Sequence, residues 1–228
     1  MDAHVGTIAS AALGAAVMYV VLRRSAKPTL PHGITVYYHS ACKAFTGRAD
    51  AIVRMLEQAG CEYSVKAPSD APASYTSDEA CFAVPIVAFP NGIVMSQSIA
   101  IAQQLGKALG LYPATVAGEA RAIQVALNVG DLLSEGGKKL KEDKPRLTKW
   151  LSVFEGTLRA SGSGFMVGPS LTFADFACYS ILKLMLTLTR EPGAYPLTVQ
   201  FVRTMDDLPA MRAFNATGVP LLPASMMP

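Results

Sequence analysis

The sequence is short of charged residues and lacks the motifs that bind metals or nucleic acids. Charged residues make up 16% of the 228 residues, against roughly 25% in ordinary soluble domains. The net charge is only +3, and no basic stripe or base-reading motif exists, so nucleic-acid binding is not expected. The three histidines and four cysteines show no zinc spacing and no CxxC pair, which argues against a zinc site and a disulfide framework.

The low charge has two interpretations. It is compatible with an ordinary helical fold, or with extra surface that is buried against a partner protein or a bilayer. The length is sufficient for one or two domains with a full hydrophobic core.

The N-terminus carries the longest uncharged apolar run. Residues 5–22 hold no charge and span about 27 Å as a helix, enough to cross a thin bilayer. Asp2 precedes this run and Arg23-Arg24 follow it, whereas a secretory signal peptide carries its positive charge first. We therefore expect a transmembrane anchor over residues 1–24. The positive-inside rule places the bulk of the chain on the cytosolic side, or on the equivalent matrix or stroma side, of an unidentified membrane.

The anchor has a second feature, and a linker follows it. Gly6, Ser10 and Gly14 form a small-residue stripe of the kind that lets another helix approach, although alanine-rich helices often contain such spacings by chance. Residues 25–32, with two prolines, read as a linker.

The next part of the chain alternates strands and helices. β-branched, aromatic and alternating patterns predict strands, and apolar residues at helical spacing predict helices. The expected order is strand 34–39, helix 47–59, strand 61–66, loop 68–79, hairpin 84–89 with 93–95, and helix 98–109. This order predicts a compact α/β domain, thioredoxin-like, over residues 33–111.

The remainder of the chain is helical. Helices are expected over residues 119–134, 145–160, 172–188, 197–204 and 209–214. Thr172 and Asp175 form a capping box with Asp in place of Glu, which is a structural motif without chemistry. An all-helical domain is therefore expected over residues 117–228.

Three motifs in order resemble the glutathione transferases. Val84-Pro85 followed by residues 96–101 (SQSIAI) is similar to the glutathione-binding half of that superfamily, and residues 164–175 are similar to its second-domain motif. Residues 47–50 (GRAD) before a helix resemble the sigma, pi and alpha classes. The resemblance covers about residues 34–215. It implies the glutathione transferase fold, with glutathione as co-substrate and no metal.

The resemblance assigns four residues to glutathione binding. It implies a cis Val84–Pro85 bond, with the Val84 backbone pairing with the cysteinyl part of the tripeptide. Gln97 and Ser98 are implied to hold the γ-glutamyl carboxylate at a helix N-terminus, where free N–H groups attract anions. Pro85 is also compatible with an ordinary strand-edge proline, and Ser98 with a simple helix cap.

The resemblance leaves more than one candidate for the residue that activates the thiol. In the family, a tyrosine hydroxyl at the end of the first strand donates to sulfur and favours the thiolate. Tyr38 is the first candidate and Tyr37 the alternative, and because they point to opposite faces only one of them can serve. Both are also compatible with a packing role.

Cys42 is a further alternative. The loop at 39–46 is longer than usual, and Cys42 in it resembles the cysteine of omega-class relatives, ahead of a helix N-terminus that lowers thiol pKa. The proline that usually follows such a cysteine is missing, so a loop cysteine without a role fits equally well.

Because of two departures from the family pattern, two functional hypotheses stay open. Ala83 stands where a glutamine is usual, and Asn128 where a partner-subunit aspartate is usual, although Asp131 lies one turn away. The first hypothesis is a membrane-anchored glutathione transferase that conjugates or isomerises small electrophiles, or a related thiol transferase. The second is a catalytically silent accessory subunit of a multi-subunit membrane complex. The expected partners are glutathione, the membrane, and either a second copy of the chain or other membrane-complex subunits.

Overall fold

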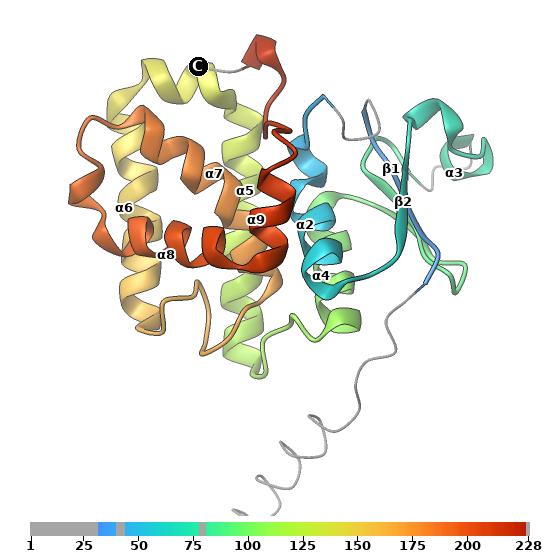
Figure 1. Ribbon diagram of the computed structural model, residues 1–228, viewed down its shortest axis with the longest axis horizontal. Helices are drawn as coiled ribbons and strands as arrows, with labels where there is room; N and C mark the ends of the chain where they lie inside the picture. Colours follow the sequence, from blue (N-terminus) through green and yellow to red (C-terminus); the bar gives the residue numbers. More distant parts are fainter. Residues whose placement is uncertain (1–31, 40–43, 78–80, 227–228) are drawn as a thin grey trace, which may run out of the picture.

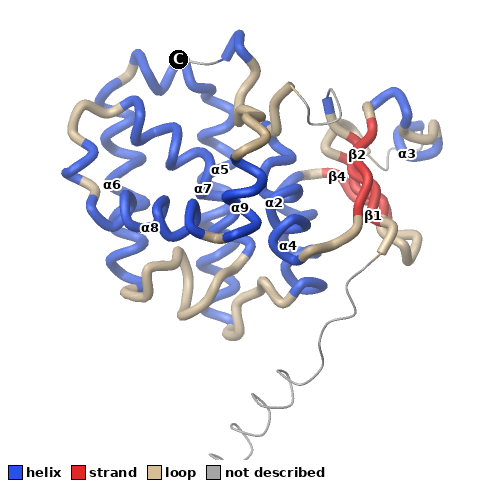
Figure 2. The backbone as a smooth tube through the Cα atoms, in the orientation of Figure 1, coloured by secondary structure: helices blue, strands red, loops and turns tan. Residues whose placement is uncertain are grey.

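A four-stranded mixed sheet forms the N-terminal half of the chain (Figures 1 and 2). Its strand order is β2-β1-β3-β4, with β1 parallel to β2, antiparallel to β3, and β3 antiparallel to β4. The strands are β1 (Ile34–Tyr37), β2 (Tyr63–Lys66), β3 (Ile86–Ala88) and β4 (Val94–Ser96). The structure is a computed structural model that describes residues 32–39, 44–77 and 81–226.

Two longer helices cover one face of this sheet. They are α2 (Asp50–Ala59), which continues the single 3-10 turn η2 (Gly47–Ala49), and α4 (Ser98–Leu109). Both lie between the sheet and the helical half of the molecule (Figure 1). Ile34 and Val36 of β1 share a fully buried core with α2 and α4. The opposite face carries η3 (Pro68–Asp70) and α3 (Ser74–Ser77).

The C-terminal half is a bundle of helices around α7 (Phe173–Leu188). Eleven of the sixteen residues of α7 are buried, which makes it the central helix of the bundle. Its neighbours include α5, α2 and α8. The other elements are α5 (Val116–Glu142), α6 (Lys144–Ser161), η4 (Pro192–Ala194), α8 (Pro196–Asp207), α9 (Pro209–Asn215) and η5 (Ala224–Met226).

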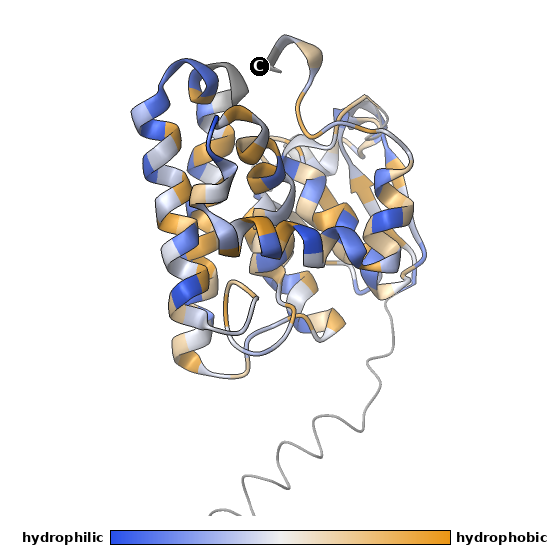
Figure 3. Cartoon of the chain, turned by 60° about the vertical axis from the view of Figure 1, so that its left-hand side comes forward, coloured by the Kyte–Doolittle hydropathy of each residue, from blue (hydrophilic) through white to orange (hydrophobic). Residues whose placement is uncertain are grey.

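Apolar residues of the helical bundle face inward, and a buried carboxylate caps the start of α8. Figure 3 shows apolar positions mainly where helices face one another. Glu155 of α6, 4% exposed, accepts hydrogen bonds from the backbone N–H groups of Leu197 and Thr198 at 3.1 and 2.8 Å. One buried carboxylate thereby satisfies the free donors at the start of α8 and fixes α8 against α6.

The capping box at the start of α7 is confirmed. Asp175 accepts hydrogen bonds from the backbone N–H and the hydroxyl of Thr172, at 2.7 and 2.9 Å. It also accepts the N–H of Met166 at 2.7 Å, so it ties the preceding loop to the helix. Burial is the largest influence on this carboxyl and raises its pKa to about 6, against the opposing effect of the hydrogen bonds that it accepts.

The expected strands and helices are confirmed, and several of them differ in extent. β1 ends at Tyr37 rather than at 39, and the expected loop 68–79 contains η3 and α3. α5 is longer than the expected 119–134, because Thr115 caps its start and Leu140, fully buried, packs its last turns into the core. Tertiary burial here extends the helix beyond the range that the local pattern predicts.

The expected anchor and linker lie outside the described residues, apart from His32 at the end of the linker. Within the part of the chain that the structure describes, no helix combines the length and the hydrophobicity that crossing a membrane requires.

Candidate functional site

The two candidate tyrosines face opposite sides of the sheet, as expected. Tyr37 packs with Tyr75 of α3, in an edge-to-face arrangement with ring centroids 6.0 Å apart. Burial, followed by the nearby Tyr75 and Asp70, raises the pKa of Tyr37. Tyr38 packs instead against Ala49 and Val53, on the side of α2. Tyr38 therefore lies on the side of the sheet that faces the helical half, and Tyr37 on the far side.

The hydroxyl of Tyr38 lies at the start of the helix that follows it. The backbone N–H of Arg48 donates to Tyr38 Oη at 2.9 Å, while the tyrosine itself is only 4% exposed. Gly47 makes this approach possible, since a Cβ added to it would lie 2.3 Å from the same oxygen. Gly47 also has a φ of +49°, which glycine adopts without steric cost.

Of the four glutathione-binding candidates, Val84 and Pro85 lie just before β3, and Gln97 and Ser98 lie at the start of α4. The Val84–Pro85 bond is cis, as the resemblance implies. Gln97 precedes α4 with a φ of 71° and is the only non-glycine residue with positive φ in the described ranges. Ser98 is the first residue of α4 rather than its cap, and no side chain caps this helix. The reading of Ser98 as a simple N-cap is therefore wrong.

A narrow slot between the two halves of the molecule joins the start of α2 to the start of α4. Arg48 and Ser98 both line it, opposite apolar residues of α5 and α7 such as Leu133 and Ile181. Its volume is about 20 Å³, which is room for a single water molecule. The slot brings together Arg48 and Ser98, but Tyr37, Tyr38, Val84, Pro85 and Gln97 are not among its lining residues.

The C-terminal segment forms part of the wall of the slot. We call residues 217–223 the C-terminal strap. The carbonyls of Pro220 and Leu221 accept the backbone N–H groups of Thr46 and Gly47 at 2.9 and 2.7 Å. The side chain of Leu221 lines the slot, and Leu222 is 3% exposed. In Figure 1 this segment runs from α9 along the seam between the two halves.

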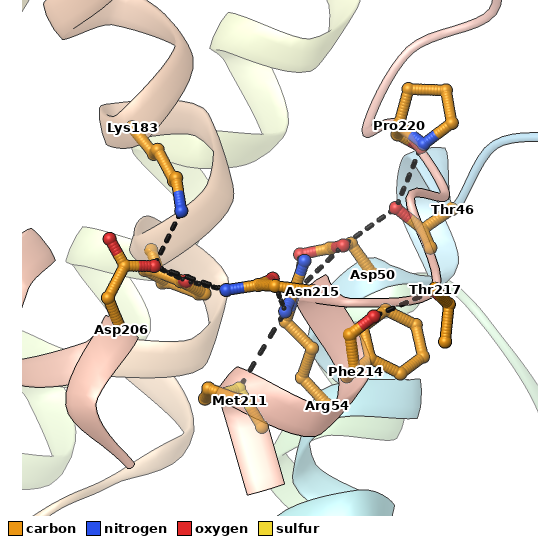
Figure 4. Close-up of polar contacts among 11 residues, drawn as sticks. Thr46, Asp50, Arg54, Lys183, Asp206, Met211, Phe214, Asn215, Thr217 and Pro220 are labelled. Carbon is orange, nitrogen blue, oxygen red and sulfur yellow. Dashed lines mark hydrogen bonds and ion pairs between the residues drawn. The ribbon is translucent and has the colours of Figure 1, made fainter. Parts of the chain in front are cut away.

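A buried polar network fixes α2 against the helical half (Figure 4). Asp50 accepts Arg54 Nε at 3.0 Å and the Thr46 hydroxyl at 2.6 Å. Arg54 Nη1 donates to Asn215 Oδ1 at 3.0 Å, and its guanidinium stacks over the rings of Tyr179 and Phe214.

The far end of this network lies on α7 and α8. Asn215 Nδ2 donates to Tyr179 Oη at 2.6 Å and to Asp206 at 3.1 Å, and Lys183 also reaches Asp206. Burial raises the pKa of Tyr179, with its hydrogen bond to Asp206 as the second cause. Four helices are thus tied to the short stretch 46–50 next to Tyr38.

The cysteines provide no second site among the described residues. Cys61, Cys81 and Cys178 are free and buried, and burial raises the pKa of the Cys61 and Cys178 thiols. Such thiols stay protonated and unreactive. Cys42, the alternative nucleophile, lies outside the described residues. No cluster of His, Cys, Asp and Glu suited to a metal ion occurs in the described ranges.

Sequence reasoning missed three parts of this region. It gave no role to the Arg48 backbone, although it singled out residues 47–50 as a motif. It also missed the strap and Asn215. The contacts of the strap with Thr46 and Gly47, and of Asn215 with Arg54, join residues more than 150 positions apart, so no local sequence pattern predicts them.

The comparisons with known proteins agree with this architecture. Residues 131–218 match the family "Glutathione S-transferase, C-terminal domain". The chain has the glutathione transferase fold. Solved structures of the same fold include the glutathione S-transferase from Ascaris lumbricoides, with 23% identity and a TM-score of 0.67 over 81% of this chain and 96% of that one. No curated protein matches the sequence.

Two further glutathione transferase structures show how far this likeness extends. The pi-class enzyme of Onchocerca volvulus has 19% identity and a TM-score of 0.72, covering 85% of this chain and 99% of that one. Na-GST-3 of Necator americanus, a monomer, has 22% identity and a TM-score of 0.67, covering 82% and 97%. The glutathione transferase fold thus accounts for nearly the full length of these relatives and for 81–85% of this chain.

Proposed function

We propose that this protein binds glutathione and conjugates it to small electrophiles, or isomerises them, while residues 5–22 hold it at a membrane. The observation that carries the proposal is the backbone of Gln97. A non-glycine residue at φ 71° costs about 1–3 kcal/mol and persists where function requires that geometry. Here it stands at the head of a twelve-residue helix, whose free N–H groups and positive end suit a carboxylate.

The proposed roles divide along the tripeptide. Gln97 and Ser98 would hold the γ-glutamyl carboxylate at the start of α4. The Val84 backbone would pair with the cysteinyl part as an added strand does. The thiol would then point toward the first strand, where Tyr38 is the proposed activating group.

Tyr38 is preferred because its hydroxyl accepts the Arg48 N–H at the start of α2. The positive end of the helix favours an anion beside this hydroxyl. A thiolate stabilised there would attack the electrophilic carbon and displace its leaving group, while the thiol proton passes to solvent. Tyr37, on the other side of the sheet, and Cys42 are the alternative groups.

Turnover of 1-chloro-2,4-dinitrobenzene with glutathione tests this assignment. Tyr38→Phe removes only the hydroxyl and should lower kcat/KM by about 100-fold, as expected for loss of a group that acts on the thiol. Tyr37→Phe is the matched control and should leave the rate unchanged. If Cys42→Ser abolishes turnover while Tyr38→Phe does not, the cysteine carries the chemistry and the tyrosine assignment is wrong.

A second function is supported by the narrow slot. The slot of about 20 Å³ between Arg48 and Ser98 leaves no room for a tripeptide or an aromatic substrate beside Ser98, and the other glutathione candidates lie outside its lining. This favours the alternative of a catalytically silent accessory subunit of a multi-subunit membrane complex. Failure to retain the protein on a glutathione resin, together with its co-purification in a large membrane assembly, would support that alternative over the enzyme.

The membrane location and the oligomeric state complete the proposal. We place the folded part on the cytosolic side, or on the matrix or stroma side, because Arg23-Arg24 follow the apolar run. Protease accessibility of the folded part in sealed vesicles tests this orientation. A homodimer and a larger membrane assembly are both compatible with the fold, and the mass of the detergent-solubilised protein distinguishes them.

A further inference from the structure

A second and larger hollow lies at the outer end of the helical half. Its volume is about 420 Å³, and the residues that line it belong to 144–148, at the start of α6, and to 189–195, the turn that joins α7 to α8. In Figure 1 both segments lie on the side of the helical half that is remote from the sheet. We call this hollow the α6 groove. It shares no lining residue with the narrow slot, and its size is typical of small-molecule sites.

The walls of the α6 groove are fixed by contacts within the protein. Lys144 Nζ, at the start of α6, donates to the carbonyl of Leu188, at the end of α7, at 3.0 Å. Both backbone groups of Tyr195 are also bonded. Its N–H donates to the Pro192 carbonyl at 3.0 Å, and its carbonyl accepts the Val199 N–H at 3.0 Å. The groove is therefore formed before a ligand arrives, which lowers the ordering cost of binding.

The side chain of Tyr195 offers a free hydroxyl to the groove. Tyr195 lines the groove although the residue is only 8% exposed. Within the described part of the chain its hydroxyl has no hydrogen-bond partner, and it is not among the fully buried polar atoms that lack one. The hydroxyl is therefore accessible, and the groove is the space that its side chain lines. Because a buried tyrosine hydroxyl usually finds a partner, this free group favours a ligand with acceptor oxygens.

The charges of the groove favour an anion with several oxygens. Lys144 and Arg190 both line it, and among the described residues Arg190 has no hydrogen bond or ion pair. Lys144 uses one N–H on Leu188 and keeps the others. Thr148 and Thr189 add hydroxyl groups. Two cations among hydroxyl donors match a phosphate monoester, which carries a charge of about −1.5 to −2 at pH 7 and three acceptor oxygens.

The remaining lining residues favour an ester over free phosphate. Glu191 is the one acid among the described residues that line the groove, and its carboxylate forms no ion pair there. A carboxylate accepts hydrogen bonds from hydroxyl groups such as those of a sugar. Leu147, 2% exposed, adds an apolar contact. A bare phosphate would fill only a small part of 420 Å³, so the ligand needs a body as well.

We propose that the α6 groove binds a phosphate monoester whose body carries hydroxyl groups, of the size of a sugar phosphate or a nucleoside monophosphate. Lys144, Arg190 and Tyr195 hold the phosphate, and Glu191 accepts hydroxyl groups of the body. A free ester and the phosphorylated headgroup of a lipid present the same groups, so the test includes both sources. The groove is separate from the slot, and the proposal does not depend on glutathione binding.

Calorimetry on the full-length protein in detergent tests the groove. The probes are ribose 5-phosphate, adenosine monophosphate and dioctanoyl phosphatidylinositol 4-phosphate, with ribose and inorganic phosphate as controls. At least one ester should bind with a Kd of about 1 mM or tighter, and at least about tenfold more tightly than either control. Binding of a soluble ester assigns the site to free esters, and binding of the lipid alone assigns it to a headgroup. No binding of any ester, or equally tight binding of inorganic phosphate, would overturn the proposal.

Two variants test whether binding occurs in the groove. Tyr195→Phe removes only a hydroxyl without a partner, and Arg190→Gln removes an exposed charge without a partner, so both should unfold at the wild-type temperature. Each should weaken binding of the ester by about tenfold or more. Arg203→Gln is the matched control, because Arg203 is exposed on α8 and does not line the groove. Its Kd should stay within about twofold of wild type. Equal affinity in all four chains would place the ester elsewhere and overturn the proposal.

Saturating glutathione distinguishes the α6 groove from the slot. The Kd of the ester should be the same with and without glutathione, because the two sites share no lining residue. Displacement of the ester by glutathione would show that both compete for one site, and the groove would then not be a second site. Failure of glutathione itself to bind would concern only the proposed function, since the ester is measured without it.

Discussion

The Nε–H of Arg54 is shared between both carboxylate oxygens of Asp50, each at 3.0 Å, with both side chains 7% exposed. This pair lies four residues apart on α2, yet its outer contacts are to Thr46 on one side and Asn215 on the other. It therefore holds the start of α2, where Tyr38 is bound, in register with the helical half. The geometry of the candidate site depends on residues that touch no ligand.

Removing only one member of the Asp50–Arg54 pair should lower the free energy of unfolding strongly. Arg54→Met leaves the buried carboxylate of Asp50 without its cation, and a loss of about 3–5 kcal/mol in the free energy of unfolding is expected. Arg212→Met is the matched control, because Arg212 pairs with Asp207 on the surface, where both side chains are at least 70% exposed. Urea unfolding measures both. The double variant Asp50→Asn with Arg54→Met should lose less than the sum of the single losses, and strict additivity would contradict the coupling.

Gly47→Ala should disturb the site more than an ordinary glycine replacement. The new Cβ would lie 2.3 Å from Tyr38 Oη, and the backbone has a φ of +49°. Gly33→Ala is the control, since its φ is +80° and nothing lies within 4 Å of the added Cβ. We expect about 1–2 kcal/mol of destabilisation for Gly33→Ala and about twice that for Gly47→Ala. Equal losses in thermal or urea unfolding would mean that the Tyr38 hydroxyl moves aside freely.

Replacing Gln97 by glycine should stabilise the fold, whereas replacing it by alanine should not. Gln97→Gly relieves the positive φ and should raise the free energy of unfolding by about 1 kcal/mol, whereas Gln97→Ala keeps the strain. If the side chain binds glutathione, both variants lose affinity by calorimetry, including the more stable one. A glycine variant that is less stable than the alanine variant would show that the backbone at 97 is not strained.

Asp175 should make the fold more stable as the pH falls through 6. Burial raises its folded pKa to about 6 from an ordinary value of 3.8, so the folded state binds the proton more tightly than the unfolded state. Stability from this group is therefore fully present below about pH 4 and is lost as the pH rises through about 6, by roughly 2–3 kcal/mol. Carbon-13 NMR titration of the Asp175 carboxyl gives the pKa directly, and a value below 4 would refute the expectation.

The carboxyl of Glu135 changes the stability of the fold with pH in the opposite direction, so its contribution must be separated from that of Asp175. Hydrogen bonding to Arg146 is the largest influence on Glu135 and lowers its pKa. Its contribution is present above its unfolded pKa and is lost as the pH falls through its folded pKa. The Asp175 contribution is therefore read from wild type against Asp175→Asn across pH 4.5–7.5, where Glu135 stays the same in both chains.

The elements with local signals could be predicted from the sequence. The bounds of α4 match the expected 98–109, because its apolar spacing and the glycine at its end are both local features. The capping box of Thr172 and Asp175 follows in the same way. α5 was predicted too short, because the burial of Leu140 that extends it is a tertiary effect.

By itself, the sequence determined the order of strands and helices, the cis bond expected at Val84–Pro85, and the opposite faces of Tyr37 and Tyr38. Each of these follows from neighbours a few residues away, through strand alternation, helix period or a resemblance carried by short motifs. Only the tertiary structure decided that Tyr38 meets the N–H of Arg48 and that the carbonyls of Pro220 and Leu221 accept the neighbouring N–H groups of Thr46 and Gly47. Those contacts join residues from distant parts of the chain, and the packing of α2 against α7 and α9, rather than any local preference, brings them within hydrogen-bond distance.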